Sequence, residues 1–198
     1  MKYAKMLGLL AVAAAALMAF AGVASATTLT SPAGTTYTST IKAASEGTTT
    51  LHNASLGVSV SCTASTVEGT VSKHGSGVTA GGNISTLTFT GCGADTVTVL
   101  ANGSLEVHNI SGGTNGTLTS TGAQITIKNG STGVSCTYTT NGTDIGTLTS
   151  SATTGKTATL DIASSIIPRT GDSILCGSKG EWTGSYVVNT PDSLLVDA

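Results

Sequence analysis

Three histidines, His52, His74 and His108, are the only side chains of this 198-residue chain whose ordinary pKa suits a general base near neutral pH. Glu106 precedes His108 by two positions, a spacing that puts both side chains on one face if the segment is a strand. A carboxylate beside an imidazole can relay a proton or help to hold a metal. Glu106 and His108 are therefore the candidate polar site, against the common alternative of two polar residues on a solvated sheet face.

An aromatic pair offers a second kind of chemistry. The only tryptophan, Trp182, lies six residues after Cys176 and four residues before Tyr186. On a strand the two rings share one face and can form a stacking platform for a sugar or another small ligand. A tryptophan beside a disulfide in a small β-domain is more often part of the core. Trp182 and Tyr186 are thus candidate ligand-binding residues, with core packing as the competing interpretation.

Other reactive motifs are missing from the sequence. It contains no G-x-S-x-G, no H-E-x-x-H and no C-x-x-C, so no nucleophile motif or spaced set of metal ligands can be assigned. We therefore expect no catalytic residue, no metal and no organic cofactor. The formal net charge of -2 gives no basic surface for nucleic acid.

Four cysteines, Cys62, Cys92, Cys136 and Cys176, predict two disulfides in an exported chain. Their pairing follows from an apparent internal duplication. A Gly-Val-Ser segment leads into Cys62 and again into Cys136, and each copy later reaches a Cys-Gly pair, at Cys92 and at Cys176. The simplest pairing is therefore Cys62 with Cys92 and Cys136 with Cys176.

Residues 1–26 have the features of a secretory signal peptide. Lys2 and Lys5 precede an apolar run, and Ala24-Ser25-Ala26 supplies the small residues of a cleavage site. The apolar run is short for a membrane span. The sequence thus predicts a secreted, extracellular bacterial protein that starts at Thr27 and has no stable membrane insertion after cleavage.

The elements that would position these residues are strands. Many segments alternate Thr with an apolar residue at period 2, as in the run from Thr86 to Thr90 and the run from Gln124 to Lys128. Asn-Gly pairs, including Asn102-Gly103 and Asn141-Gly142, predict two-residue hairpin turns between strands. No segment after residue 26 shows a helical period.

We therefore predict an all-β fold of about 10 to 13 short strands, an antiparallel β-sandwich with a β-barrel as the alternative. Residues 27–198 are expected to form a single domain with two disulfide-linked pseudo-repeats, residues 27–112 and 113–198. Two sequential small sandwiches are the alternative to that single domain.

The mature chain resembles uncharacterised secreted bacterial β-proteins rich in Thr, Ser and Gly. The signal peptide, the Thr-Leu-Thr-Ser-Pro-Ala-Gly opening at residues 28–34 and the Cys-Gly pairs carry the resemblance. It implies no activity, and no functional residue can be carried over from it.

Ser and Thr make up 62 of the 198 residues, whereas charged residues make up only 9%. A disulfide-stapled scaffold with a neutral, hydroxyl-rich surface favours a structural or surface-associated interaction protein, whose partner would be a cell-surface protein or a glycan. A carbohydrate- or small-ligand-binding module is the alternative, and a secreted hydrolase is the third and least favoured class.

Overall fold

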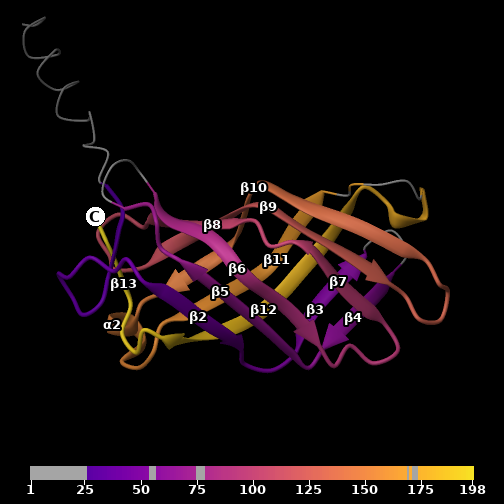
Figure 1. The fold of residues 1–198 in the computed structure, drawn as a ribbon, viewed down its shortest axis with the longest axis horizontal. Helices are drawn as coiled ribbons and strands as arrows, with labels where there is room; N and C mark the ends of the chain where they lie inside the picture. The colour runs from indigo at the N-terminus through magenta and orange to yellow at the C-terminus, as the bar shows by residue number, and fades with distance from the viewer. Residues whose placement is uncertain (1–25, 54–56, 75–78, 169, 171–173) are drawn as a thin grey trace, which may run out of the picture.

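The computed structural model describes residues 26–53, 57–74, 79–168, 170 and 174–198 (Figure 1). Strands make up 63% of the chain, which confirms the all-β prediction. A four-residue helix, α2 (Ser151–Thr154), and a 3-10 turn, η1 (Ile174–Cys176), are the only helical segments among the described residues. The strands there are β1 (Thr28–Thr30), β2 (Thr40–Ser45), β3 (Thr49–Asn53), β4 (Val58–Cys62), β5 (Ala64–Thr70), β6 (Ala80–Thr90), β7 (Thr96–Ala101), β8 (Ser104–Asn109), β9 (Gly116–Lys128), β10 (Ser135–Thr149), β11 (Thr159–Pro168), β12 (Lys179–Thr190) and β13 (Leu195–Asp197).

Eight of these strands close into an antiparallel β-barrel, so the predicted sandwich is not confirmed. The hydrogen-bonded order is β11, β10, β9, β8, β6, β5, β2 and β12, and β12 returns to β11. β12 closes the ring because both of its edges are occupied: Tyr186 lies opposite Leu160 of β11 and opposite Ser45 of β2. This pairing joins positions far apart in the chain, which alternation within single strands cannot reveal.

Several short strands follow one another along a common partner. β2 and β3 both pair with β12, β5 and β4 run beside them, and β7 and β8 both pair with β9. The ring therefore combines long strands such as β9, β10 and β12 with the shorter strands β2, β5 and β8. The extra strands β3, β4 and β7 extend it at the end opposite to β1 and β13 (Figure 1).

Two predicted hairpin turns are wrong. Asn102 and Gly103 separate β7 from β8 along one edge of β9, and Asn141 and Gly142 lie inside β10 where the register shifts. Both glycines have the positive φ that an Asn-Gly turn would need, 70° and 65°. Gly142 lies at a β-bulge, where the pairing of β10 with β9 shifts, whereas Gly103 lies at a break between two strands that keep one register along β9.

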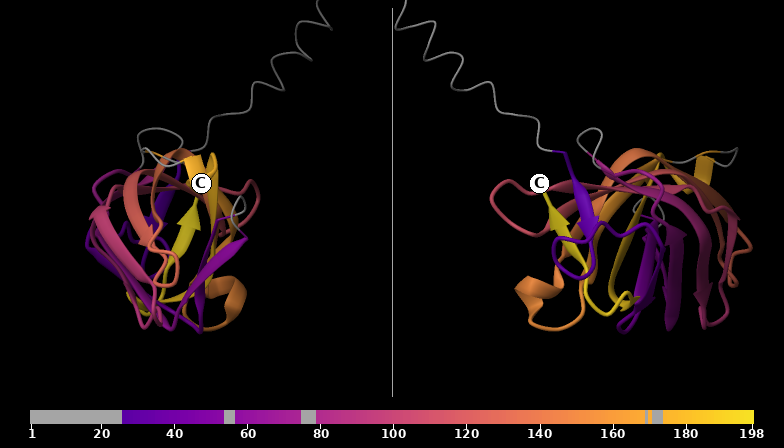
Figure 2. Two further views of the ribbon diagram at one scale, coloured as in Figure 1. Left: turned by 90° about the vertical axis from the view of Figure 1, so that its right-hand side faces the viewer. Right: turned by 60° about the vertical axis from the view of Figure 1, so that its left-hand side comes forward.

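The small sheet of β1 and β13 covers one end of the barrel (Figure 2). Leu29 of β1, Val196 of β13 and Leu194, just before β13, are at most 1% exposed and belong to the barrel core. The N–H of Val196 donates to the carbonyl of Thr114, and the side-chain amide of Asn109 donates to the carbonyl of Val196. The first and last strands of the described chain thus close the core together.

Both predicted disulfides are confirmed: Cys62 is bonded to Cys92 and Cys136 to Cys176. The ring takes β2, β5, β6 and β8 from residues 27–112 and β9 to β12 from residues 113–198. Cys62 ends a strand outside the ring, whereas Cys136 lies in a strand of the ring. The internal duplication that suggested the pairing stays a prediction.

Candidate functional site

The aromatic pair lies inside the barrel. Trp182 is 6% exposed and Tyr186 is fully buried, because alternate residues of β12 face the core. The Trp182 ring meets the rings of Phe89 and Tyr186 edge to face, at centroid distances of 5.8 and 6.2 Å. The Tyr186 hydroxyl donates to Ser65 Oγ over 3.0 Å. Trp182 and Tyr186 therefore serve core packing, and a sugar platform built on their exposed rings is ruled out by their burial.

Glu106 and His108 share one face of β8, and Glu106 has a different partner from the predicted one. Lys73 Nζ donates to Glu106 Oε1 over 2.6 Å. This hydrogen bond holds the pKa of Glu106 below its ordinary value, partial burial opposes the effect, and the charges of Lys73 and His108 add to it. A carboxylate held ionised in this way is poorly suited to donate a proton. The reactive pair Glu106 and His108 stays a prediction.

A second histidine, His52, lies within hydrogen-bond distance of a serine hydroxyl. His52 Nδ1 lies 2.8 Å from Ser59 Oγ on the neighbouring strand β4, and Glu181 of β12 is opposite His52 on the other side. Ser59, His52 and Glu181 together have the residue types of a hydrolytic triad. However, Glu181 forms no ion pair with His52, and exposed Ser59 lies on an outer sheet surface. The contact is a cross-strand hydrogen bond rather than an assembled catalytic site.

The barrel interior is filled by side chains. A cavity of about 70 Å³ lies below β1 and β13, walled by apolar residues such as Val71, Leu118 and Leu194. Other voids between the core side chains measure about 10 to 20 Å³. Ligand pockets commonly measure about 300 to 1,000 Å³. An eight-stranded barrel can either pack its interior or hold one small ligand, and this barrel is packed.

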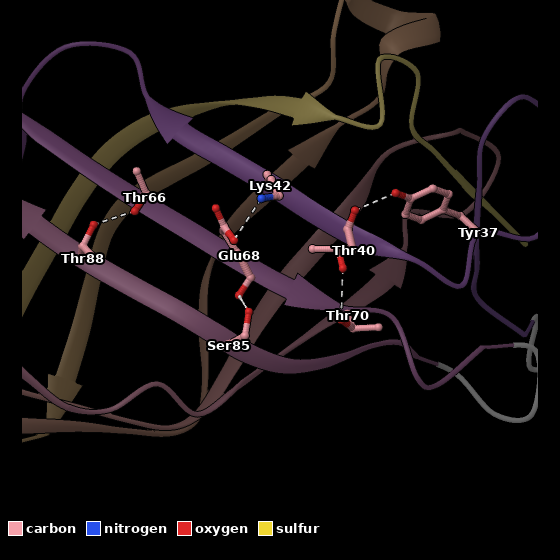
Figure 3. Close-up of polar contacts among 8 residues, drawn as sticks. All are labelled: Tyr37, Thr40, Lys42, Thr66, Glu68, Thr70, Ser85 and Thr88. Carbon is pink, nitrogen blue, oxygen red and sulfur yellow. Dashed lines mark hydrogen bonds and ion pairs between the residues drawn. The ribbon is translucent and has the colours of Figure 1, made fainter.

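The outer face of β2, β5 and β6 carries the most regular polar array. We call it the hydroxyl face and define it by the outward residues Thr40, Lys42, Thr66, Glu68, Thr70, Thr86 and Thr88. Figure 3 shows most of these side chains standing in cross-strand rows. The rows arise because Thr occupies alternate positions on adjacent strands whose register places these positions opposite one another.

Hydrogen bonds and one ion pair connect the hydroxyl face across its strands. Thr66 and Thr88 hydroxyls lie 2.6 Å apart, and those of Thr40 and Thr70 lie 3.3 Å apart (Figure 3). Between these rows, Lys42 Nζ lies 3.4 Å from Glu68 Oε2. The opposite charges cancel, so the face is neutral and presents hydroxyl donors and acceptors at strand spacing.

Two polar, Gly-rich segments of the sequence, Gly75 to Asn83 and Gly112 to Gly116, have the composition of loops that could contact a partner. Residues 75–78 of the first loop lie outside the described residues, and Ala80 to Asn83 pair with β8 as part of β6 instead of forming a loop. In the second loop, Gly112 and Gly113 are exposed, whereas Gly116 is buried at the start of β9. Only part of the predicted loop surface is therefore available.

Sequence reasoning missed one buried polar cluster. Asn53 Nδ2 donates to the Tyr138 hydroxyl and to the carbonyl of Cys176, over 2.8 and 3.1 Å, and Tyr138 donates to that carbonyl over 3.1 Å. These contacts attach β3 and β10 to the second disulfide. No local sequence pattern predicts these hydrogen bonds, since Asn53, Tyr138 and Cys176 lie far apart in the sequence.

The described residues contain no group of three His, Cys, Asp or Glu side chains arranged to hold a metal ion. In that same part of the chain, no helix has the length and apolar character needed to cross a membrane. Comparisons with family models, curated proteins and solved structures found no match to this chain.

Proposed function

We propose that the chain is a secreted, surface-associated interaction protein that works through the outside of its barrel. The hydroxyl face carries this proposal. Its Thr side chains form neutral cross-strand rows on a rigid sheet, while the aromatic residues that would otherwise bind a ligand fill the core. A fixed array of hydroxyls suits a neutral, hydroxyl-rich partner, and we propose a cell-surface glycan.

The filled interior supports an external binding surface over a ligand carried in the barrel. The cavity of about 70 Å³ is far smaller than the pocket of a typical small-ligand protein. Outer strand positions, by contrast, can change without disturbing the core because they alternate with the buried ones. Binding on the outer surface is therefore compatible with a stable, packed barrel.

Secretion is part of the same proposal. Two disulfides suit an oxidising compartment, and residues 1–26 have the composition of a signal peptide. Thr27, the first residue after the proposed cleavage site, is 1% exposed and its hydroxyl accepts from the N–H of Asn109. Amino-terminal sequencing of exported protein should begin at Thr27; a start that retains Lys2 and the apolar run would contradict secretion by cleavage. We also propose that the chain belongs with the secreted Thr/Ser/Gly-rich bacterial proteins that it resembles.

The glycan proposal can be tested with isosteric substitutions. The double substitution Thr66→Val/Thr88→Val removes one hydroxyl row of the hydroxyl face and keeps the side-chain shape. The matched control Thr126→Val/Thr137→Val removes a similar hydroxyl pair, 2.8 Å apart, from β9 and β10. On an array of neutral cell-envelope glycans, the first variant should lose binding and the control should keep it. Equal binding by both variants, or no binding by the unmodified protein, would contradict the proposal.

A further inference from the structure

The barrel has one open seam, formed by two strand edges. From Ile84 to Thr90, β6 pairs with β5 on one edge, and its other edge has no strand partner in the described part of the chain. β7 likewise pairs with β9 alone among the described strands. β6 does pair with β8 from Ala80 to Asn83. The edge of β6 therefore loses its strand partner only from Ile84 onward, where β7 takes the place of β8 beside β9. We call these two edges, Ile84 to Thr90 and Thr96 to Ala101, the open seam.

The narrow end of the seam is fixed by two contacts. The N–H of Ile84 donates to the carbonyl of Gly103 over 2.9 Å, and Asn102 Nδ2 donates to the carbonyl of Ser85 over 2.7 Å. Beyond them no backbone hydrogen bond joins β6 to β7 among the residues that the structure describes. The seam therefore begins at Asn102 and Gly103, the break between β7 and β8.

Anchors at the other end hold the strands apart. Cys92, just after β6, is bonded to Cys62 of β4. Asp95, just before β7, accepts from the N–H of Gly130 over 2.9 Å and from Asn129 Nδ2 over 3.1 Å, both in the turn between β9 and β10. The short connection between β6 and β7 is thus attached to two different parts of the barrel, so that closing the seam would require breaking one attachment.

The seam lacks the features that usually protect a strand edge. Neither edge contains a charged residue or a proline. Leu87, Phe89, Val97 and Val99 point toward the core, while Thr residues and Leu100 point outward. Leu100 is 56% exposed and is one of four exposed large apolar side chains in the described chain. Each edge presents backbone N–H and C=O groups that an added strand could pair with.

We propose that the open seam binds an extended segment of another protein by β-strand addition. The segment would pair its backbone with β6, β7 or both, and its residues would alternate apolar side chains toward the core with small neutral ones toward solvent. This partner differs from the glycan of the proposed function. It would pair with backbone groups of the strand edges, whereas the glycan would contact outward hydroxyls, including those of Thr86 and Thr88 on the same strand β6. A failure of either proposal leaves the other standing.

A short peptide can serve as the probe. We would use the blocked peptide Lys-Thr-Val-Thr-Val-Thr-Val-Thr-Lys and a control in which proline replaces the central valine, since proline cannot donate to a ladder. In the free protein, amides of the seam should exchange rapidly with deuterium. The first peptide should slow that exchange in β6 beyond Ile84 and in β7, and should leave exchange in β8 unchanged. The proline peptide should have no effect on exchange in any of these strands.

Two substitutions locate the binding. Leu100→Lys puts a charge on the seam and removes an apolar contact, and should weaken peptide affinity about tenfold. Ile110→Lys, the matched control, changes a residue of 43% exposure beyond the end of β8 and should leave affinity unchanged. Both residues are exposed, so both variants should fold.

Three results would overturn the inference. The seam amides could already be protected in dilute free protein, which would mean that the seam is closed. Peptide binding could be absent, or equally affected by both substitutions. Protection that rises with protein concentration in the absence of peptide would identify a second copy of this chain as the occupant, in place of a different protein.

Discussion

Tyr186 shows how burial changes the role of a residue that had suggested ligand binding. Its ring is fully buried, and its hydroxyl donates to Ser65, which is itself 1% exposed. Burial raises the pKa of Tyr186 above its ordinary value of 10.0, with hydrogen bonds opposing the effect. The folded protein therefore keeps the phenol protonated to a higher pH than the unfolded chain does.

Tyr186 should contribute to the alkaline loss of stability. Above about pH 10 the unfolded chain releases the phenolic proton while the folded chain retains it, so the free energy of unfolding falls as pH rises. Tyr186→Phe should flatten this fall and cost about 1 to 2 kcal/mol at neutral pH, because Ser65 loses its partner. Ser65→Ala, which keeps the phenol, should retain the steep fall. Urea denaturation between neutral and alkaline pH measures both effects, and an unchanged alkaline slope in Tyr186→Phe would contradict the expectation.

Glu106 provides a second test at the scale of one residue. Because the hydrogen bond from Lys73 lowers the pKa of Glu106, Lys73→Met should raise that pKa toward the ordinary value of 4.5. Nuclear magnetic resonance titration of the Glu106 carboxylate measures the change. Lys42→Met, which removes the cation beside Glu68, serves as a control and should leave the titration of Glu106 unaltered. A Glu106 titration that is the same with and without Lys73 would show that the ion pair does not form in solution.

Among the elements, glycines decide where long strands can bend. Gly103 and Gly142 have the same positive φ, yet their surroundings differ. A Cβ atom on Gly103 would lie 2.3 Å from the N atom of Ala123 and 2.4 Å from the carbonyl of Thr121, whereas one on Gly142 would meet nothing within 4 Å. Gly103 is thus packed against β9, whereas Gly142 is open to solvent.

The two glycines should therefore respond differently to substitution. Gly142→Ala should lower the free energy of unfolding by about 1 kcal/mol, because alanine is strained only by the left-handed backbone conformation. Gly103→Ala adds a collision with backbone atoms and should lower the free energy of unfolding by about 1 to 3 kcal/mol more. Equilibrium unfolding in urea compares the two variants directly. Equal losses would mean that β9 moves freely away from Gly103.

The strands and the disulfides could be predicted from the sequence, whereas the barrel closure could not. Alternation within Thr86 to Thr90 or Gln124 to Lys128 is local, so it identifies a half-buried strand without its neighbours. Closure depends on β12 pairing with both β11 and β2. The Asn-Gly signal was misleading because a bulge and a hairpin turn require the same positive φ.

The candidate site could be predicted even less well. The sequence identified Trp182 and Tyr186 as a pair on one face and left open which face it was. The structure places that face inside. The hydroxyl face depends on the register between three strands, and Lys73 reaches Glu106 from a segment before β6. Contacts between such distant segments cannot be predicted from the spacing of residues within one segment.

At the scale of the whole molecule, one disulfide connects β4 to the end of β6, and the other connects β10 to η1. They close segments of 30 and 40 residues, and loops of this size each contribute roughly 3.5 to 4 kcal/mol by the chain-entropy relation. The double substitutions Cys62→Ser/Cys92→Ser and Cys136→Ser/Cys176→Ser should each lower the free energy of unfolding by about that amount. Denaturation without reductant measures both losses. A loss below about 1 kcal/mol in either variant would show that the bridge adds little to the folded state.

The pairing of β1 with β13 also has a kinetic consequence. The Thr30 hydroxyl donates to the Asp197 carboxylate across 167 positions of the chain, so this contact requires nearly the largest loop closure that the chain permits. Strand pairs between neighbours in the sequence can form without the contact of Thr30 with Asp197. The pairing of β1 with β13 should therefore form last during folding. The same three-residue ladder should be the first to fray in the native state. Because each of these two strands is the other's ladder partner, detachment of one end of the described chain should expose the other end to solvent.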